Sequence, residues 1–438
     1  MRTGPTVLGM LIFVAILLLI DWYVFSGVKA ATSALAARTR RIIHWAYWIL
    51  NIGLAVSMCL IPLMANFSKG LPRPIMSFFG LWVLVFVPKL VFLIFLLGED
   101  IYRILRGIFA ASRNVIVNDA DKMELFESRR RFISTMAAAT AAIPFLGIIH
   151  GMATGKFRYR VHRETIYFPD LPDAFDGFTI TQLSDIHVGS FDPESDREDV
   201  RHGIQLANAE NSDLFVFTGD LVNNIAVEMD PWIDEFSKLR AKHGQFSILG
   251  NHDYGDYVPW DSKEEKEANM QKLYATHALL GFRLMRNENA VIEKDGDKLH
   301  LIGVENWGSG GFKKKGDLDL ALQGVPDDGF KLLLSHDPSH FDEIVSQHPK
   351  QIHLTLSGHT HGAQFGVEIP GIKWSPVKYR YPHWAGLYDE AKRFIYVNRG
   401  FGFLAFPGRV GIWPEITVLT LKKGARKVMN ETSDKGRA

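Results

Sequence analysis

Five short motifs in the second half of the sequence combine histidine with aspartate, asparagine and glycine in patterns that suit metal chemistry. In chain order they are Asp185-Ile186-His187, Gly219-Asp220-Leu221-Val222-Asn223, Gly250-Asn251-His252-Asp253, the lone His336, and Gly358-His359-Thr360-His361-Gly362. Their ligand atoms are imidazole nitrogens, carboxylate oxygens and an amide oxygen, without sulfur. This donor set suits manganese, iron or zinc better than copper(I) or a structural zinc knot.

The spacing within the motifs favours a dinuclear centre. Residues two apart in an extended segment project to the same side. Asp185 with His187, and His359 with His361, can therefore each present two ligands to one cavity. Two divalent ions about 3.5–4 Å apart need a bridging oxygen, and Asp220 at a glycine turn is the natural candidate. Such a centre can bind a phosphate ester and lower the pKa of a bridging water.

The elements that must position these motifs are short strands alternating with helices. We predict buried strands and helices from about Phe157 onward, and this alternation indicates a layered α/β fold. The predicted strands are 178–183, 214–217, 246–249, 299–304, 331–334 and 352–356, and the predicted helices are 197–209, 231–242 and 263–280. The motifs follow strand ends, where open α/β sheets place their ligand sites.

The order of the five motifs resembles the calcineurin-like metallophosphoesterase family over roughly residues 157–421. The segments Asp170-Leu171-Pro172, Tyr396-Val397-Asn398-Arg399-Gly400 and Pro414-Glu415-Ile416-Thr417 make the bacterial membrane-associated branch the most similar. The resemblance implies a four-layer α/β/β/α sandwich with two mixed sheets, and two divalent ions, with manganese favoured over iron or zinc.

Carried over by position, the resemblance also implies a role for each motif residue. One metal would be held by Asp185, His187, Asp220 and His361, and the other by Asp220, Asn251, His336 and His359. His252 would protonate the leaving group or steady the phosphate, and Asp253 would orient His252. Ala363 departs from the usual glycine, and Glu305-Asn306-Trp307 lacks the usual paired acidic residues and receives no role.

The first third of the chain is strongly apolar. Three runs, 7–26, 42–67 and 75–98, are long enough to cross a bilayer, which takes about 20 residues. A fourth run, 133–152, is Ala-rich and contains Pro144. A signal peptide would need one short apolar stretch, so it cannot explain three long ones. We therefore predict an N-terminal transmembrane helical bundle in residues 1–155, a catalytic domain in residues 156–424 and a basic polar tail in residues 425–438.

Lys and Arg in the loops predict the orientation. The two loops on one side carry eleven, among them the Arg129–Arg131 cluster, and the opposite side carries seven. Loops rich in Lys and Arg stay in the cytoplasm, and long domains are translocated largely regardless of charge. We therefore expect a multi-pass plasma (inner) membrane protein with its catalytic domain outside the cytoplasm. One segment resembles a twin-arginine export signal: Ser128-Arg129-Arg130-Arg131-Phe132-Ile133. An equal alternative is a cluster of arginines that only keeps this loop in the cytoplasm.

Three further features leave alternatives open. Asp21 and Lys89 lie at comparable depths and can pair or snorkel to the interface. Aromatic and basic residues in 373–384 suit a membrane interface, and packing of a C-terminal β-layer explains them as well. The net charge of +1 gives no support for nucleic-acid binding, and the single Cys59 excludes an intrachain disulfide. The oligomeric state is not determined by the sequence.

The expected activity is hydrolysis of a phosphate ester or pyrophosphate by a metal-activated hydroxide. The membrane tether favours a lipid-linked or envelope substrate. A broad phosphodiesterase or phosphatase for small soluble esters is the alternative enzyme. A membrane receptor or scaffold with an inactive hydrolase domain is the alternative of another class, and the intact ligand set argues against it. Metal content of the purified protein separates the enzyme from the scaffold.

Overall fold

A computed structural model describes residues 7–64, 69–112, 119–390, 392–425 and 427–430. The chain divides into two compact units. The first comprises residues 1–66 and 74–150, and the second comprises residues 67–73 and 151–438. Each unit is described below by itself.

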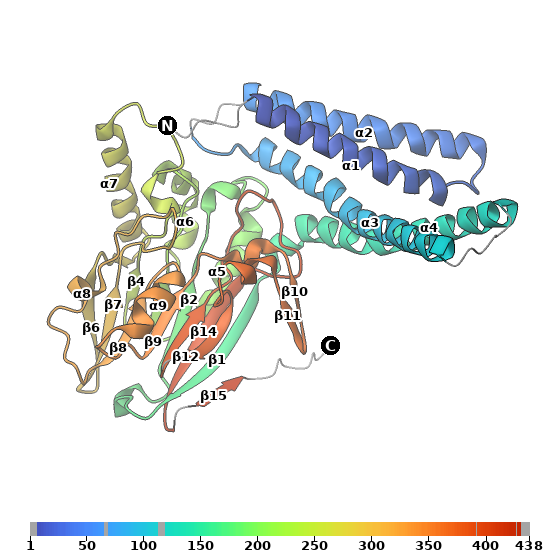
Figure 1. Cartoon of the computed structure of the whole chain (residues 1–438). Helices are drawn as coiled ribbons and strands as arrows, with labels where there is room; N and C mark the ends of the chain where they lie inside the picture. Colours follow the sequence, from blue (N-terminus) through green and yellow to red (C-terminus); the bar gives the residue numbers. More distant parts are fainter. Residues whose placement is uncertain (1–6, 65–68, 113–118, 391, 426, 431–438) are drawn as a thin grey trace. The chain divides into compact units, whose positions relative to one another are not determined.

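The first unit contains four long helices among the described residues (Figure 1). They are α1 (Val7–Ala31), α2 (Ala37–Met64), α3 (Arg73–Ser112) and α4 (Asp119–Ala153). Each is long and apolar enough to cross a membrane, including Ser128–Ala153 of α4. Pro144 therefore does not prevent the fourth run from forming a helix of spanning length, although it lies within the helix. The last residues of the predicted second run, 65–67, lie outside the described residues.

Polar side chains join the helices of this unit. Lys89 of α3 donates a hydrogen bond to Asp21 of α1 at 2.5 Å and another to Asn51 of α2, so the structure pairs the two charges. Arg130 of α4 lies 3.0 Å from Asp100 of α3. The middle arginine of the Arg129–Arg131 cluster thus makes a contact within the bundle.

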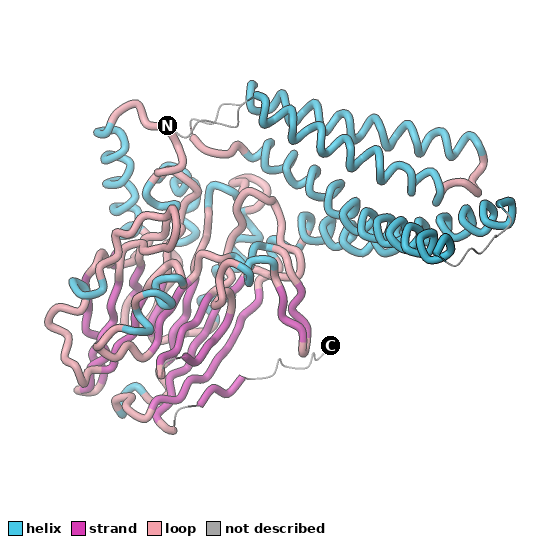
Figure 2. The backbone as a smooth tube through the Cα atoms, viewed as in Figure 1, coloured by secondary structure: helices cyan, strands magenta, loops and turns pink. Residues whose placement is uncertain are grey.

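The second unit is built on two mixed sheets, drawn as magenta strands in Figure 2. The first has the order β15-β1-β14-β2-β3-β4-β5. Its strands are β1 (Arg160–Phe168), β2 (Thr179–Leu183), β3 (Leu214–Phe217), β4 (Gln245–Ser247), β5 (Arg283–Leu284), β14 (Glu415–Lys423) and β15 (Lys427–Asn430). The second has the order β12-β13-β9-β8-β7-β6. Its strands are β6 (Glu288–Lys294), β7 (Asp297–Gly303), β8 (Phe330–Leu334), β9 (Leu354–Ser357), β12 (Gly386–Glu390) and β13 (Arg393–Val397).

Parallel pairing aligns the strand ends that carry the motifs. Strands β2, β3, β4 and β5 pair in parallel in the first sheet, as do β7, β8, β9 and β13 in the second. A separate hairpin of β10 (Val367–Ile369) and β11 (Ile372–Trp374) follows the last motif.

The two sheets pack face to face, and helices cover their outer faces. Ile180 and Val216 of the first sheet share one buried apolar cluster with Leu301 and Leu332 of the second. The helices are α5 (Arg197–Ala209), α6 (Ile233–Phe236), α7 (Lys263–Leu279), α8 (Leu318–Ala321) and α9 (Ser339–Glu343). The 3-10 helices are η1 (Gly155–Phe157), η2 (Asp173–Phe175), η3 (Val188–Ser190), η4 (Ala226–Trp232), η5 (His252–Tyr254), η6 (Val345–Gln347), η7 (His361–Gln364) and η8 (Pro376–Tyr379). The predicted α/β/β/α fold, preceded by apolar helices, is confirmed.

Two predicted elements differ from the structure. The helix predicted over 231–242 is only the 3-10 helix η4 followed by one turn, α6. Trp232, Phe236 and Leu239 are buried, and this burial does not require a continuous helix. Within the predicted tail 425–438, β15 pairs antiparallel with β1, and residues 426 and 431–438 lie outside the described residues.

Candidate metal centre

The motif loops are fastened to one another at the strand ends. The backbone N–H of Asp185, after β2, donates to the carbonyl of Gly219 at 2.9 Å, after β3. The N–H of Gly358, after β9, donates to the carbonyl of His336 at 2.9 Å, after β8. A Cβ atom at position 250 would lie 2.2 Å from Oδ1 of Asp220, so only glycine allows this loop to approach. The sheet edges therefore bring five segments, distant in sequence, to one place.

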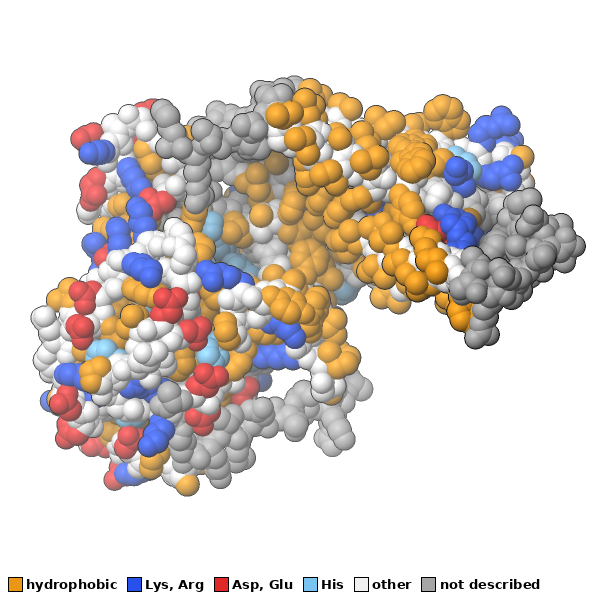
Figure 3. All heavy atoms as spheres, viewed as in Figure 1, with side chains coloured by type: hydrophobic (Ala, Val, Ile, Leu, Met, Phe, Trp, Pro, Cys, Tyr) orange, Lys and Arg blue, Asp and Glu red, His pale blue; other side chains and the backbone are white. Residues whose placement is uncertain are grey.

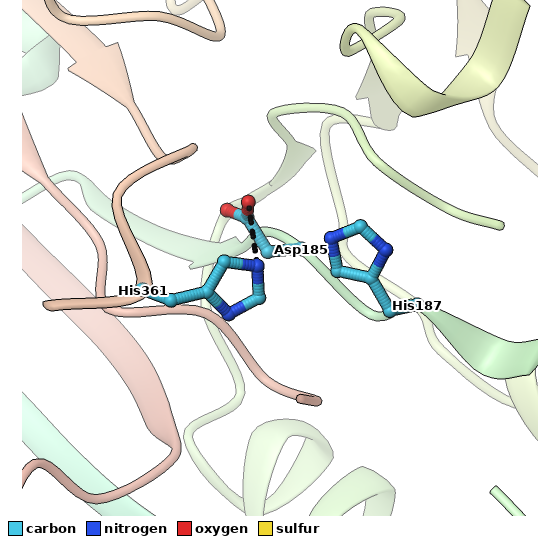
Figure 4. Close-up of side chains that lie close together, drawn as sticks. All are labelled: Asp185, His187 and His361. Carbon is cyan, nitrogen blue, oxygen red and sulfur yellow. Dashed lines mark ion pairs between the residues drawn. The ribbon is translucent and has the colours of Figure 1, made fainter. Parts of the chain in front are cut away.

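The first cluster contains Asp185, His187 and His361 (Figure 4), whose offered ligand atoms all lie within 4.8 Å of one another. All three residues are buried. Nε2 of His361 lies 3.3 Å from Oδ1 of Asp185. Both Asp185 oxygens also accept the backbone N–H of His359, at 2.9 and 3.0 Å, which fixes the carboxylate toward the last motif.

The second cluster contains Asp220, His336 and His359. Oδ2 of Asp220 lies 3.2 Å from Nε2 of His336 and 3.4 Å from Nε2 of His187, which belongs to the first cluster. The Asp220 carboxylate therefore lies between the two groups, where a shared ligand would be. Its Oδ1 accepts the backbone N–H of His252, the residue after Asn251, at 2.8 Å.

Buried polar atoms without partners show that the residues fit metal ions. Polar groups in a protein interior are almost always hydrogen-bonded. Six buried atoms at this site have no hydrogen-bond partner among the described residues: Nδ1 and Nε2 of His187, Nε2 of His336, Nε2 of His361, Oδ1 of Asn251 and Oδ2 of Asp337. Imidazole nitrogens and carboxyl or amide oxygens are ligands of divalent cations, so bound ions would satisfy this donor set.

The electrostatics of the site also favour cations. Although burial disfavours the charged forms, the surrounding imidazoles hold the pKa of Asp220 well below its usual range. Burial likewise opposes a charge on His336, yet the Asp220 carboxylate raises the pKa of His336 to about 10. Burial together with His187 and Arg409 lowers the pKa of His361 well below its usual value, which keeps this imidazole neutral. Asp220 therefore stays ionised and His361 stays uncharged at neutral pH.

Backbone carbonyls fix the ring orientation of two of the histidines. His336 Nδ1 donates to the carbonyl of Thr218, and His252 Nδ1 donates to the carbonyl of Asn223, both at 2.7 Å. A donor at Nδ1 leaves Nε2 with a lone pair when the ring is neutral, and at His336 a bound cation would take the place of the Nε2 proton. Burial lowers the pKa of His252 to about 4.

The carboxylate of Asp253 is hydrogen-bonded to backbone N–H groups of two loops. Its carboxylate accepts the backbone N–H groups of Gly250, Asp220, Leu221 and Val222 at 2.8, 2.9, 2.9 and 3.3 Å. The ring of His252 is held instead by Asn223. Burial and the neighbouring Asp220 carboxylate raise the pKa of Asp253 to about 7, while the backbone donors act in the opposite direction. Asp253 therefore joins the Asp220 loop to the Asn251 loop.

Other side chains at the site were not found from the sequence. Asp337 is buried beside His336 and lies 3.5 Å from Nε2 of His359. The hydroxyl of Tyr381 lies 2.8 Å from the same nitrogen. Nη2 of the fully buried Arg409 lies 3.1 Å from Nδ1 of His361. Asp337 follows a motif residue, but Tyr381 and Arg409 come from segments without a motif.

Five motif residues adopt left-handed backbone conformations. Asp185, His187, Asp220, His359 and His361 have φ between 47° and 71°. Ala363, at the position where the resemblance expects glycine, has φ 51° and keeps the conformation that glycine adopts most readily. The chain therefore turns sharply after a strand at three of the five motifs.

Comparison with known proteins agrees with this fold. Residues 6–156 match the family described as "Probable Calcineurin-like phosphoesterase, transmembrane domain", and residues 178–363 match "Calcineurin-like phosphoesterase". The chain is 32% identical over 304 residues to uncharacterized metallophosphoesterase YkuE of Bacillus subtilis, covering 67% of this chain and 98% of that protein. It is 28% identical over 298 residues to phosphodiesterase YaeI of Escherichia coli, covering 67% and 99%.

The likeness to a third relative extends further along the chain. A Bos taurus transmembrane protein with metallophosphoesterase domain is 28% identical over 351 residues, covering 77% of this chain and 71% of that protein. The chain belongs to the calcineurin-like phosphoesterase family and is a membrane protein and a metallophosphoesterase. The resemblance stated from the motifs is confirmed.

Proposed function

We propose that this protein hydrolyses a phosphate ester or pyrophosphate bond at a dinuclear centre. The observation that carries the proposal is the pair of buried ligand clusters with the Asp220 carboxylate between them. One ion would be held by Asp185, His187, Asp220 and His361, and the other by Asp220, Asn251, His336 and His359. When bound, two divalent ions, with manganese favoured, would hold phosphate oxygens and lower the pKa of a water molecule between them.

His252 is the proposed acid. Its Nδ1 is committed to the Asn223 carbonyl, so Nε2 is the atom available to a leaving group. Burial keeps the ring neutral before substrate binds, and the negative charge of a phosphate ester would raise its pKa and favour a proton at Nε2. Asp253 supports this step indirectly, because it fixes the loop from which His252 projects.

We further propose that residues 156–424 form the catalytic domain and residues 1–155 the membrane region. The domain would lie outside the cytoplasm at the plasma membrane, since the eleven Lys and Arg of the predicted inner loops outnumber the opposing seven. A lipid-linked or envelope substrate is favoured because the centre is tethered to apolar helices. The relative YaeI is named a phosphodiesterase, which supports testing diesters.

The central experiment compares the wild-type protein with Asp220→Asn. Full-length protein in detergent is assayed for bound metal and for hydrolysis of phosphomonoesters, phosphodiesters and phospholipid-like pyrophosphates with added manganese. We expect about two metal ions per wild-type chain, and loss of both metal and activity in Asp220→Asn because the shared negative charge is removed. Full turnover with two metals retained in the variant would refute the bridging role.

The orientation has its own test. Reporter proteins fused after Met429, one active only outside the cytoplasm and one only inside, are compared in intact cells. Activity of the outside reporter supports the proposed topology. A cytoplasmic signal would overturn the envelope substrate and leave the metal centre unaffected, since the two arguments share no residues.

A further inference from the structure

The hairpin β10–β11 has its apolar and polar faces reversed relative to an ordinary surface hairpin. Val367 pairs with Trp374 and Ile369 pairs with Ile372, so these four side chains share one face. Their exposed fractions are 42%, 40%, 55% and 54%. Surface hairpins normally turn this face toward the core, so an exposed apolar face of this kind indicates a contact with another surface.

The opposite face of the hairpin is polar and bound to the domain. Glu368 pairs with the buried Arg399 at 2.5 Å, and Arg399 also pairs with the buried Glu415 of β14. Nζ of Lys373 donates to the carbonyl of Ala385 at 2.5 Å and lies 5.3 Å from the centre of the Trp384 ring. These bonds hold the hairpin in one orientation, so its apolar face cannot turn inward without breaking a buried ion pair.

The base of the hairpin lies beside the point where the last membrane-length helix ends. Gly151, near the end of the apolar segment Ser128–Ala153, accepts a hydrogen bond from the N–H of Arg409 at 3.1 Å. The next residue, Val410, donates to the carbonyl of Gln364 at 2.8 Å and accepts from Gly366 at 2.9 Å. Gly366 directly precedes β10. One short segment, 409–410, therefore joins the end of the apolar helix to the start of the hairpin.

The residues after the hairpin suit the water–lipid boundary. Lys378, Tyr379 and Arg380 are all exposed, with Tyr379 at 78%. Aromatic rings and basic side chains concentrate where a membrane meets water, and the cations attract anionic headgroups. This arrangement favours a lipid surface over a water-exposed role for the apolar face.

From these observations we propose that the β10–β11 hairpin docks into the surface of the bilayer that the apolar helices of the same chain span. Val367, Ile369, Ile372 and Trp374 enter the interfacial region, and Lys378 faces the headgroups. β10 begins three residues after the end of η7 (His361–Gln364), and Tyr381 contacts His359. Docking of the hairpin therefore holds the metal centre at headgroup level. This inference does not depend on which ester is hydrolysed or on which side of the membrane the domain lies.

The test measures lipid contact at single labelled positions in the full-length protein. Ile369→Cys and Ile372→Cys are each made in a Cys59→Ala background, labelled with an environment-sensitive fluorophore, and reconstituted at one chain per nanodisc. The matched control is Val291→Cys, an exposed apolar position on β6 with 44% exposure. Nanodiscs with and without nitroxide-labelled acyl chains are compared, and unchanged metal content shows that each variant is folded.

We expect blue-shifted emission and strong nitroxide quenching at positions 369 and 372, severalfold greater than at position 291. Quenching no greater than that of the Val291→Cys control would overturn the proposal. Blue-shifted emission without quenching would also overturn it, because the face would then be covered by protein, such as the end of this chain or a second copy. If Ile369→Cys does not fold, Ile372→Cys carries the test alone.

Discussion

Replacing Asp253 with asparagine tests whether this carboxylate joins two loops of the metal centre. In the native protein its Oδ2 accepts from Gly250 and Asp220, and its Oδ1 accepts from Leu221 and Val222. The amide of Asp253→Asn keeps one acceptor oxygen and turns an NH₂ group toward the other two backbone donors. Two buried N–H groups then lose their partner. Each costs about 1–3 kcal/mol, so the variant loses about 2–6 kcal/mol of local stability.

The assay must report on this part of the chain, because the protein has two units and a single unfolding free energy is not well defined for it. Amide hydrogen exchange, followed by mass spectrometry, is measured for peptides covering 218–223 and 249–255 in detergent-purified protein. Protection of these peptides should fall by about 30-fold or more for a loss of 2 kcal/mol or more. Manganese affinity should fall as well, since both loops carry proposed ligands.

The matched control is Asp256→Asn, three residues further along. Asp256 pairs with Lys266 and Lys313 and is partly exposed. Solvent-accessible ion pairs contribute about 0–1 kcal/mol to stability. The amide hydrogens of the same peptides should therefore exchange in Asp256→Asn nearly as they do in the wild type. If Asp253→Asn kept wild-type protection and metal affinity but lost activity, Asp253 would act through His252, and our reasoning would be refuted.

Three further predictions concern separate parts of the molecule. His252→Ala should retain its metals and slow turnover by about 10²–10⁴, the range for a general acid, with a smaller loss of rate for good leaving groups such as nitrophenol. An equal loss of rate for good and poor leaving groups would assign His252 to substrate positioning. Lys89→Met should lower the unfolding temperature in detergent, because Asp21 is left buried without its partner. Adding Asp21→Leu to Lys89→Met should restore most of the lost unfolding temperature. If the double variant did not recover, the two charges would not be coupled. Burial opposes the charge on Glu415, but Arg399 and hydroxyl donors lower its pKa from 4.5 to about 2. The contribution of ionised Glu415 to the free energy of unfolding is therefore complete above pH 4.5 and is lost as the pH falls toward 2. Thermal unfolding should therefore show a steeper loss of stability over that interval in the wild type than in Glu415→Gln.

The sequence predicted well where local pattern and burial coincide. Strands 214–217 and 331–334 are fully buried runs, and their ends carry motifs that parallel pairing brings to one edge. Helix α5 was predicted at its observed bounds because its apolar residues recur at helical spacing. Motif order was enough to indicate the family, since five ordered motifs rarely arise by accident.

What the sequence could not predict depends on contacts between distant segments. The parallel pairing of β1 with β14 joins residues more than 250 positions apart and has no local signal. Arg409 reaches the His361 ring through a tertiary contact, and an isolated arginine between glycine and valine carries no indication of that role. The contact of the His252 ring with the carbonyl of Asn223 also has no local signal, because Asp253 is the neighbour of His252 in sequence.

The left-handed backbone at Asp185, His187, Asp220, His359 and His361 has an evolutionary consequence. Such a conformation costs an L-residue about 1 kcal/mol or more at each position. Bound cations stabilise the folded state and offset this cost, but only in a protein that binds them. In a lineage that had abandoned hydrolysis, selection for stability would favour glycine or asparagine at these turns, since both adopt the conformation with less strain. Glycine or asparagine at the equivalent turns is therefore expected in a relative that has become a scaffold, and aspartate and histidine at all five in a relative that binds metal.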